Sequence, residues 1–169
     1  MAVATAIPIE TYLRTSFVDL DREFRDGELV ERSMPDYLHG KTQALLCVFF
    51  MALRKSLSLF PCVETRMRMR SGRTLIPDVA VFYPTEPSRI PDTPPLLAIE
   101  VLSLDDPLAE VRAKLEEYRT WGVPHVWLVD PHAQRLYDAN ANGPGRLGEV
   151  DLLEIPELSI RLTAADAFD

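Results

Sequence analysis

Hydrophobic and polar residues alternate along several short segments, a pattern typical of β-strands with one buried face. We expect strands at residues 28–32, 63–70, 74–82, 96–102, 125–129, 135–138 and 149–155. Helical spacing of apolar residues predicts helices at about residues 9–19, 35–59 and 107–121. The last helix should end at Gly122, because glycine suits the left-handed position after a helix. Residues 84–95 and 142–145 are expected to be loops. This order predicts an α/β fold, a mixed β-sheet flanked by helices.

Two acidic residues lie inside these apolar strands. Alternation places Asp78 on one strand face with Ala80 and Phe82, and Glu100 on one face with Ala98. Burial of an unpaired carboxylate costs several kcal/mol, so two such acids need a cation. Magnesium suits them, because it takes hard oxygen ligands and leaves positions for water and phosphate. An aspartate after a proline is also often a turn or cap residue, whereas nothing on the second strand solvates Glu100.

A lysine follows these acids on the third predicted helix. Lys114 lies at the margin of the apolar stripe, from which a lysine can reach a metal-bound water or a phosphate. An exposed ion pair with Glu110, four residues earlier, explains the same lysine without any site. The stripe itself consists of Leu108, Val111, Leu115 and Tyr118.

Several short motifs, in this order and spacing, carry a family resemblance. They are Asp26-Gly27-Glu28, Met34-Pro35, His39, Pro77-Asp78, Ile99-Glu100-Val101-Leu102-Ser103, Lys114 with Tyr118, and Gly122-Val123-Pro124 followed by Asp130-Pro131. Together they resemble the Uma2 family, described as putative restriction endonucleases, within the PD-(D/E)xK nuclease superfamily. The resemblance runs from about residue 17 to the C-terminus. It implies a restriction-endonuclease-like fold.

The resemblance also implies a metal site and a catalytic lysine. Asp78 and Glu100 correspond to the acidic pair that binds Mg²⁺, with Mn²⁺ as a substitute, and the Val101 carbonyl is a further candidate ligand. In the superfamily the lysine stands two residues after the second acid, a position that Leu102 occupies here. Lys114 matches the displaced lysine of this family, and it would position or activate the attacking water.

Four further residues are expected to support this site. Glu28 matches an early family glutamate, and Glu31 is a weaker candidate because it lies beside Arg32 in a segment expected to be solvated. His39 also matches the family, although a histidine at a helix start is more often a capping or packing residue. Tyr118, one helical turn after the lysine, would brace it.

Nucleic-acid binding is harder to infer than metal binding. The net charge of −8 opposes nonspecific attraction to a polyanion. Local charge differs, because Arg66, Arg68 and Arg70 alternate on one predicted strand face and Arg73 follows them. This row predicts a track of phosphate contacts, and a solvated strand face is the alternative.

Length and composition narrow the class of protein. A chain of 169 residues suits one domain, and we expect a single domain over residues 1–169 with an N-terminal extension at 1–16. No membrane span or secretory signal is visible, so a cytoplasmic protein is expected. Cys47 and Cys62 are expected to be reduced packing thiols, and the three histidines form no zinc pattern.

The sequence therefore predicts a magnesium-dependent DNA endonuclease that hydrolyses phosphodiester bonds. The alternative is a catalytically silent nucleic-acid-binding or assembly module that retains the nuclease fold, with a homodimer as its expected form. A nuclease acting on RNA or branched DNA is a third reading. All three share the expected fold, so they differ only in the chemistry of the site.

Overall fold

The computed structural model describes residues 7–15, 22–25, 28–31, 35–69, 71–140 and 147–169. Its helices are α1 (Ile9–Arg14), α2 (Tyr37–Leu57), α3 (Leu108–Trp121) and α4 (Ala164–Phe168), with a short 3-10 helix at Pro156–Leu158. Its strands are β1 (Arg22–Arg25), β2 (Glu28–Glu31), β3 (Phe60–Val63), β4 (Met67–Arg68), β5 (Thr74–Leu75), β6 (Val79–Phe82), β7 (Leu97–Val101), β8 (His125–Asp130), β9 (Arg135–Asp138), β10 (Gly148–Val150), β11 (Leu152–Ile155) and β12 (Ile160–Thr163).

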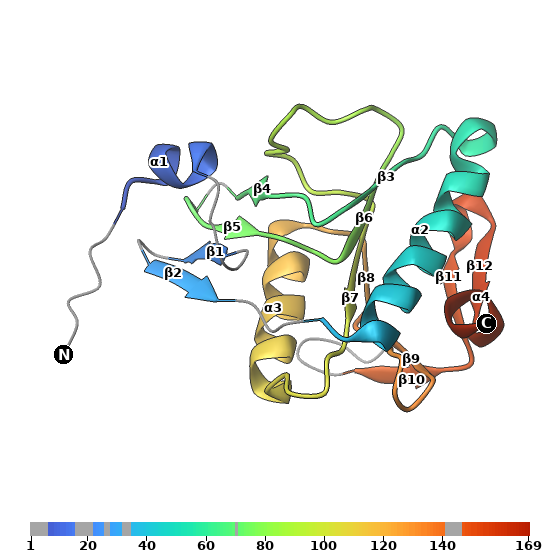
Figure 1. Ribbon diagram of the computed structural model, residues 1–169. Coiled ribbons are helices and arrows are strands. Elements are labelled where there is room, and N and C mark those ends of the chain that lie inside the picture. The colour runs from blue at the N-terminus through green and yellow to red at the C-terminus, as the bar shows by residue number, and fades with distance from the viewer. Residues whose placement is uncertain (1–6, 16–21, 26–27, 32–34, 70, 141–146) are drawn as a thin grey trace.

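A six-stranded sheet forms the centre of the molecule (Figure 1). Its strand order is β10-β9-β8-β7-β6-β3, and only the β7–β8 pair is parallel. The helix α3 connects these two parallel strands, as a parallel pair requires a crossover. The pairs β1–β2, β4–β5 and β11–β12 form three separate two-stranded sheets. The predicted α/β fold with a mixed sheet flanked by helices is confirmed.

The helix α2 covers one face of the central sheet. Leu46 and Phe50 of α2 pack with Ile99 of β7 and Trp127 of β8 in one core cluster. The hairpin β11–β12 and the helix α4 extend this cluster on the same side of the sheet (Figure 1). Helix α2 begins at Asp36, whose side chain accepts a hydrogen bond from the His39 backbone N–H at 2.9 Å.

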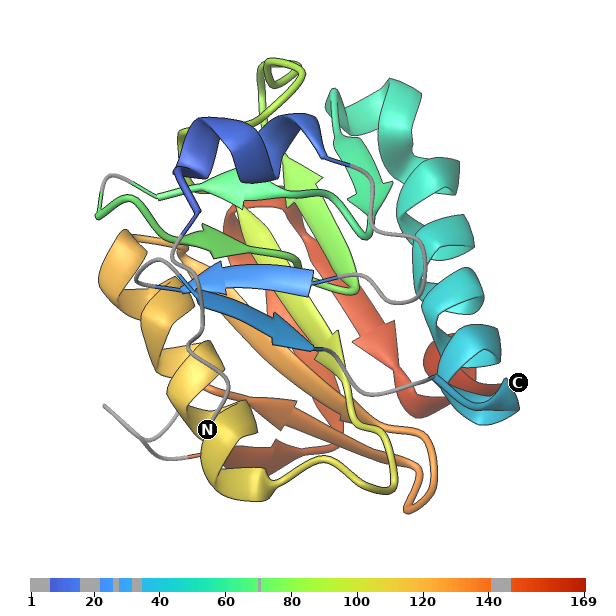
Figure 2. The same cartoon turned by 60° about the vertical axis from the view of Figure 1, so that its left-hand side comes forward.

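The helix α3 covers the opposite face. Leu115 and Tyr118 of α3 pack against Ala98 and Leu128 in a second core cluster. The hairpins β1–β2 and β4–β5 and the helix α1 lie on this side as well (Figure 2). Helix α3 ends as predicted, because Gly122 adopts a φ of 100° at its C-cap.

Three predicted strands are wrong in extent, because each one is interrupted. The strand expected at 63–70 divides into β3 and β4, since Glu64 takes a left-handed φ of 49° between them. The strand expected at 74–82 divides into β5 and β6, because Pro77 has no N–H for a ladder. The strand expected at 149–155 divides at Asp151 into β10 and β11, which belong to different sheets.

Other differences lie near the chain ends. Helix α1 ends at Arg14 rather than near residue 19, because Thr15 is extended with a ψ of 134°, and residues 16–21 lie outside the described part of the chain. The expected loop at 142–145 also lies outside it. Strands β1 and β12 and the helix α4 were not expected from the alternation of residues.

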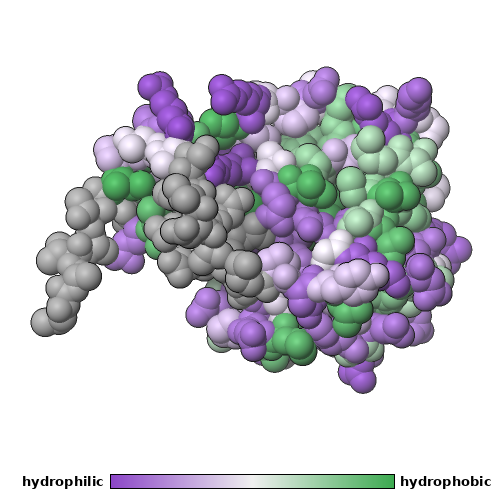
Figure 3. Space-filling model, in the orientation of Figure 1, coloured by the Kyte–Doolittle hydropathy of each residue, from purple (hydrophilic) through white to green (hydrophobic). Residues whose placement is uncertain are grey.

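The surface of α2 is partly apolar. Apolar side chains are exposed along α2, including Val48 and Met51, and Figure 3 shows apolar residues over this helix. Within the described ranges, no helix is long and apolar enough to cross a bilayer.

Cys47 and Cys62 are both free and partly buried. Burial raises the pKa of the Cys62 thiol, which keeps this thiol protonated near neutral pH.

Candidate active site

Asp78 and Glu100 come together because their strands are adjacent and antiparallel. Val79 of β6 lies opposite Ile99 of β7, so the next pair along the same register is Asp78 with Glu100. Residues directly opposite each other in such a pair project from the same face, with Cβ atoms roughly 5 Å apart. The face is the one that α3 covers, and the two acids are 2% and 8% exposed. Period-2 alternation predicted this placement correctly.

Asp78 occupies the point where the chain enters β6. Its carboxylate Oδ2 accepts a hydrogen bond of 2.6 Å from the Val101 backbone N–H on the neighbouring strand. This contact joins two strands, so Asp78 is neither a local turn residue nor a helix cap. The contact also places the main chain of Val101, the further candidate ligand, beside the acidic pair.

Glu100 is held by two side chains from α3. Lys114 Nζ lies 2.9 Å from Glu100 Oε2, and the Tyr118 hydroxyl donates to Glu100 Oε1 at 2.7 Å. Lys114 Nζ also donates to the Ile76 carbonyl at 2.9 Å, which links α3 to the segment that leads to Asp78. Lys114 and Tyr118 are four residues apart and therefore lie on one helix face. The alternative of an exposed pair with Glu110 is wrong, because the Lys114 side chain is only 12% exposed and contacts Glu100.

The first turn of α2 also contacts the acidic pair. His39 Nε2 lies 3.3 Å from Asp78 Oδ2, and the imidazole is buried. The His39 backbone N–H takes part in capping, while its side chain contacts the acidic pair. His39 therefore combines the helix-start position expected from the sequence with a direct contact to the site.

Gln43 is a residue that the sequence reasoning missed. It follows His39 by four residues on the same face of α2, and its Nε2 donates to the Asp78 carbonyl oxygen at 2.9 Å. The same nitrogen donates to Glu64 Oε1 at 2.9 Å. Gln43 thus fixes the backbone of Asp78 against α2. Its spacing from His39 on a helix was the one signal available.

The charges of this cluster do not cancel through its lysine alone. We call Asp78, Glu100, Lys114, Tyr118 and His39 the acidic cluster. It contains two carboxylates, one ammonium group and one imidazole, whose Nε2 lies 3.3 Å from Asp78 Oδ2. Buried carboxylates are costly unless they are paired, and a bound cation is one way to offset their charge.

The donors present suit magnesium in kind. Two carboxylates and the Val101 carbonyl offer hard oxygen atoms, and magnesium commonly takes one or two carboxylates and fills its other positions with water and phosphate oxygens. Across the described residues, no group of three or more His, Cys, Asp and Glu side chains is arranged to hold a metal ion. A magnesium site here would therefore depend on main-chain, water and substrate oxygens as well.

Glu28 and Glu31 both belong to the β1–β2 hairpin, at the two ends of β2. Glu28 is exposed, and among the described residues no hydrogen bond or ion pair connects it to Asp78 or Glu100. The side chain of Glu31 lies outside the described part of the structure.

The predicted arginine row is only partly formed. Arg66 precedes the short strand β4, which contains Arg68, and both side chains contact α1 or its C-terminal residue Thr15. Arg73 forms a 3.1 Å ion pair with Glu117 of α3. Arg70 lies outside the described residues.

The sheet order and its helices define a nuclease-like fold, and comparisons with known proteins give the family. The Uma2 family model, described as "Putative restriction endonuclease", matches residues 9–163, and the chain belongs to this family. The crystal structure of a protein from Anabaena variabilis ATCC 29413, titled a putative nuclease belonging to DUF820, is similar with a TM-score of 0.80. The two chains are 20% identical, and the match covers 96% of this chain and 97% of the other. No curated protein matches the chain.

Proposed function

We propose that this protein is a magnesium-dependent DNA endonuclease that hydrolyses phosphodiester bonds at the acidic cluster. Membership of a family described as restriction endonucleases supports a nuclease. The observation that carries the proposal is the convergence of Lys114, Glu100 and Asp78, with Lys114 2.9 Å from Glu100 and Asp78 bonded to the next residue, Val101. This combination of two acids and a lysine is suited to phosphodiester hydrolysis.

The residues of the cluster would divide the chemistry among them. Asp78, Glu100 and the Val101 carbonyl would hold Mg²⁺, or Mn²⁺ in its place. The bound metal would lower the pKa of a water molecule and offset negative charge on the scissile phosphate. Lys114 would orient that water and stabilise the developing charge, because its ammonium group is already directed toward Glu100.

Two side chains would keep this arrangement in place. Tyr118 donates to Glu100 Oε1 and would restrict the rotation of that carboxylate. His39, 3.3 Å from Asp78 Oδ2, would orient the other acid. Both are positioning residues in this proposal.

The test is cleavage of supercoiled plasmid with Mg²⁺ or Mn²⁺, against a reaction with EDTA. We expect the wild type to nick or linearise the plasmid, and Asp78→Asn, Glu100→Gln and Lys114→Met to lose this activity. Glu110→Gln and Lys55→Met are matched controls, because they remove the same charges from exposed positions on α3 and α2. Equal cleavage by the three cluster variants and the wild type would sink the assignment. Cleavage assays with RNA and with branched DNA as substrates would identify a nuclease that acts on those molecules instead.

A second function, a catalytically silent nucleic-acid-binding or assembly module, has one observation in its favour. Both oxygens of Glu100 already accept hydrogen bonds from side chains of α3. A module of this kind would keep the cluster as a structural network. Titration calorimetry separates the two, because the nuclease should show Mg²⁺ or Mn²⁺ binding that is lost in Asp78→Asn and Glu100→Gln. The homodimer and the cytoplasmic location both stay predictions.

A further inference from the structure

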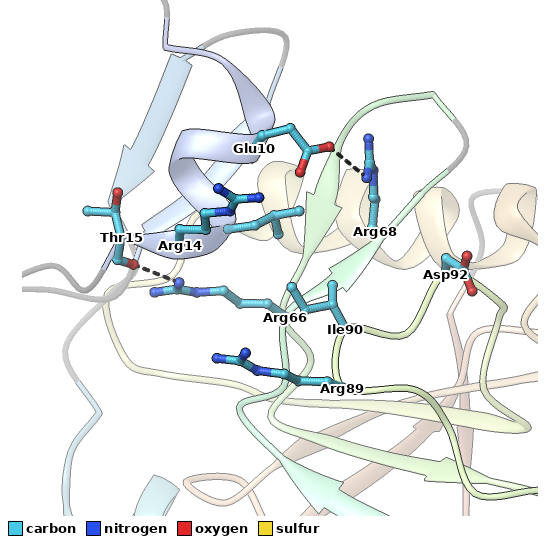
Figure 4. Close-up of a pocket in the computed structure, with 9 residues that line it drawn as sticks. Glu10, Arg14, Thr15, Arg66, Arg68, Arg89, Ile90 and Asp92 are labelled. Atoms are coloured by element: carbon cyan, nitrogen blue, oxygen red, sulfur yellow. Dashed lines mark hydrogen bonds and ion pairs between the residues drawn. The ribbon is translucent and has the colours of Figure 1, made fainter.

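Three segments far apart in the sequence line a pocket of about 540 Å³ on the α3 side of the sheet (Figure 4). They are α1 with Thr15, the strand β4 with the preceding Arg66, and part of the proline-rich loop at 84–95. We call it the arginine pocket. The arginine pocket and the acidic cluster share no residue.

Hydrogen bonds hold both walls of the arginine pocket to β4. Arg66 Nη1 donates to the Thr15 carbonyl at 2.9 Å, and its guanidinium lies 5.0 Å from the centre of the Tyr12 ring. On the other side, the Arg68 backbone N–H donates to the Pro91 carbonyl at 2.7 Å. The pocket is therefore a built feature of the fold, in which α1 and the loop are both attached to one strand.

The charge of the pocket is opposite to that of the whole chain. It is lined by four arginines, of which Arg68 is paired with Glu10 at 2.9 Å. Arg14 and Arg89 are exposed, and neither has an ion-pair partner among the described residues. Figure 4 shows Arg66 and Arg89 extending side by side to the left of the view, Arg14 extending from α1 in a different direction, and Asp92 away from these three arginines. Three cations of an acidic protein thus line one pocket.

Such an arrangement favours an oxyanion. Like charges that face one opening repel one another, and a bound anion removes that repulsion. Guanidinium groups match phosphate oxygens with two parallel hydrogen bonds, which makes arginine the usual residue for phosphate recognition. The net charge of −8 makes general attraction of nucleic acid weak, so a local site has to supply the contacts.

The arginine pocket is also close to the acidic cluster along the chain. Arg68 of β4 pairs with Thr74 of β5, and Asp78 follows four residues later. Four residues of extended chain span at most about 14 Å. The elements that carry the two features, α1, β4 and α3, lie on the same side of the sheet (Figure 2).

We propose that the arginine pocket binds a backbone phosphate of the DNA substrate through Arg14, Arg66 and Arg89, outside the scissile bond. This inference rests on the proposed function for its choice of DNA as the ligand. It assigns Arg14 and Arg89 to DNA binding and gives Arg68 a structural role in holding α1.

The test measures binding of a fluorescent 20-base-pair duplex by polarisation in EDTA, over a range of salt concentrations. Arg14→Ala and Arg89→Ala should each weaken binding roughly tenfold, the size expected for a hydrogen bond between charged groups. Each should also lower the slope of log Kd against log salt by about one. Arg54→Ala and Arg161→Ala are controls, because they remove the same charge from exposed positions on α2 and β12, and Arg161→Ala also removes a 3.1 Å ion pair with Glu154. Thermal unfolding of the two pocket variants should be unchanged, since Arg14 and Arg89 have no ion pair within the described part of the chain.

Two outcomes would overturn this inference. One is binding by both pocket variants that equals that of the controls, and the other is a wild type that does not bind the duplex. Cleavage of plasmid, measured separately, keeps the two proposals distinguishable. Binding that depends on Arg14 and Arg89 without any metal-dependent cleavage would reject the endonuclease and keep the pocket. Metal-dependent cleavage with unaltered binding in the two variants would reject only the pocket.

Discussion

The two faces of the central sheet are built from the same strands but differ in chemistry. The face toward α2 contains Val79, Ile99 and Val101, which belong to one core cluster. The face toward α3 contains Ala80 and Ala98 in its middle. At its end, the same face places Asp78 and Glu100 opposite each other.

This difference shows how a small sheet can be both stable and reactive. Alternation lets β7 direct Ile99 into an apolar core and the next residue, Glu100, into a polar cluster. The small alanines leave room for α3 to approach, so that Lys114 and Tyr118 reach Glu100. Packing on one face thus supports the burial of charge on the other.

The largest expected effect is on catalysis at the α3 face. Replacement of Glu100 by glutamine keeps the shape of the side chain but removes a charge from the proposed metal site. We expect the rate of plasmid cleavage to fall by about 10²- to 10⁴-fold, the range typical for loss of a group that acts in the chemical step. Initial rates at saturating Mg²⁺, per folded molecule by circular dichroism, measure this. A fall of less than threefold would contradict a role for this carboxylate.

Replacement of Lys114, the cationic side chain on the α3 face, should lower the free energy of unfolding. In Lys114→Met the ammonium group that offsets the charge of buried Glu100 is lost, and breaking a buried pair typically costs roughly 3 to 5 kcal/mol. The double variant with Glu100→Gln should recover part of this loss, because the carboxylate charge is then gone as well. Urea unfolding of the wild type, both single variants and the double variant, in EDTA, gives the coupling free energy. Additive losses would mean that the two residues do not interact.

A substitution on the α2 face should lower the free energy of unfolding but leave the rate of cleavage almost unchanged. Ile99→Ala removes buried methyl groups from the apolar cluster, and such changes cost about 2 to 5 kcal/mol of unfolding free energy. The rate of cleavage per folded molecule should remain within about twofold of the wild type, since the side chain points away from the acidic cluster. Ile99 and Glu100 are neighbours in sequence, so this pair of variants tests the division between the faces directly. A large loss of rate in Ile99→Ala would show that the faces are coupled.

A smaller effect is expected at Tyr118. The variant Tyr118→Phe keeps the ring in the second core cluster and removes the hydroxyl that donates to Glu100 Oε1. Hydrogen bonds to charged groups contribute roughly 1.5 to 3 kcal/mol, so stability should fall by about this amount. Cleavage should decrease less than in Glu100→Gln, because the hydroxyl positions the acid without contacting the substrate. Urea unfolding measures the loss of stability, and cleavage rates of the same preparation measure the loss of activity.

The sequence predicted the part of the site that depends on local periodicity. Alternation placed Asp78 and Glu100 on buried faces, and helical spacing placed Lys114 at the margin of the apolar stripe that contains Tyr118. It could not place Arg66 against Tyr12, because that contact depends on how α1 packs on β4. The left-handed backbone of Glu64, which divides two strands, could not be predicted either. Glycine and asparagine are the residues that usually adopt this conformation, and this position is a glutamate.

The sequence contains a local pattern that indicates the start of the last helix, α4. Thr163 and Asp166 have the spacing of a capping box, and in α4 each side chain bonds to the other's backbone. Ile160 and Leu162 alternate with polar residues in β12 before it. The C-terminal hairpin and helix were therefore predictable from local rules, unlike the contacts of α1.

The smallest expected effect tests this cap at the start of α4. Hydrogen bonds from the Thr163 side chain and backbone lower the pKa of the Asp166 carboxyl below its usual value of 3.8. A lowered pKa in the folded state means that the ionised form stabilises the fold above about pH 5, and that this contribution is lost as the pH falls below 3.8. Asp166→Asn should therefore destabilise the protein at pH 7, by less than about 1 kcal/mol because the group is exposed. The difference from the wild type should shrink at pH 3, which urea unfolding at the two pH values would measure. A difference that is equal at both would mean that the charge of Asp166 plays no part in the cap.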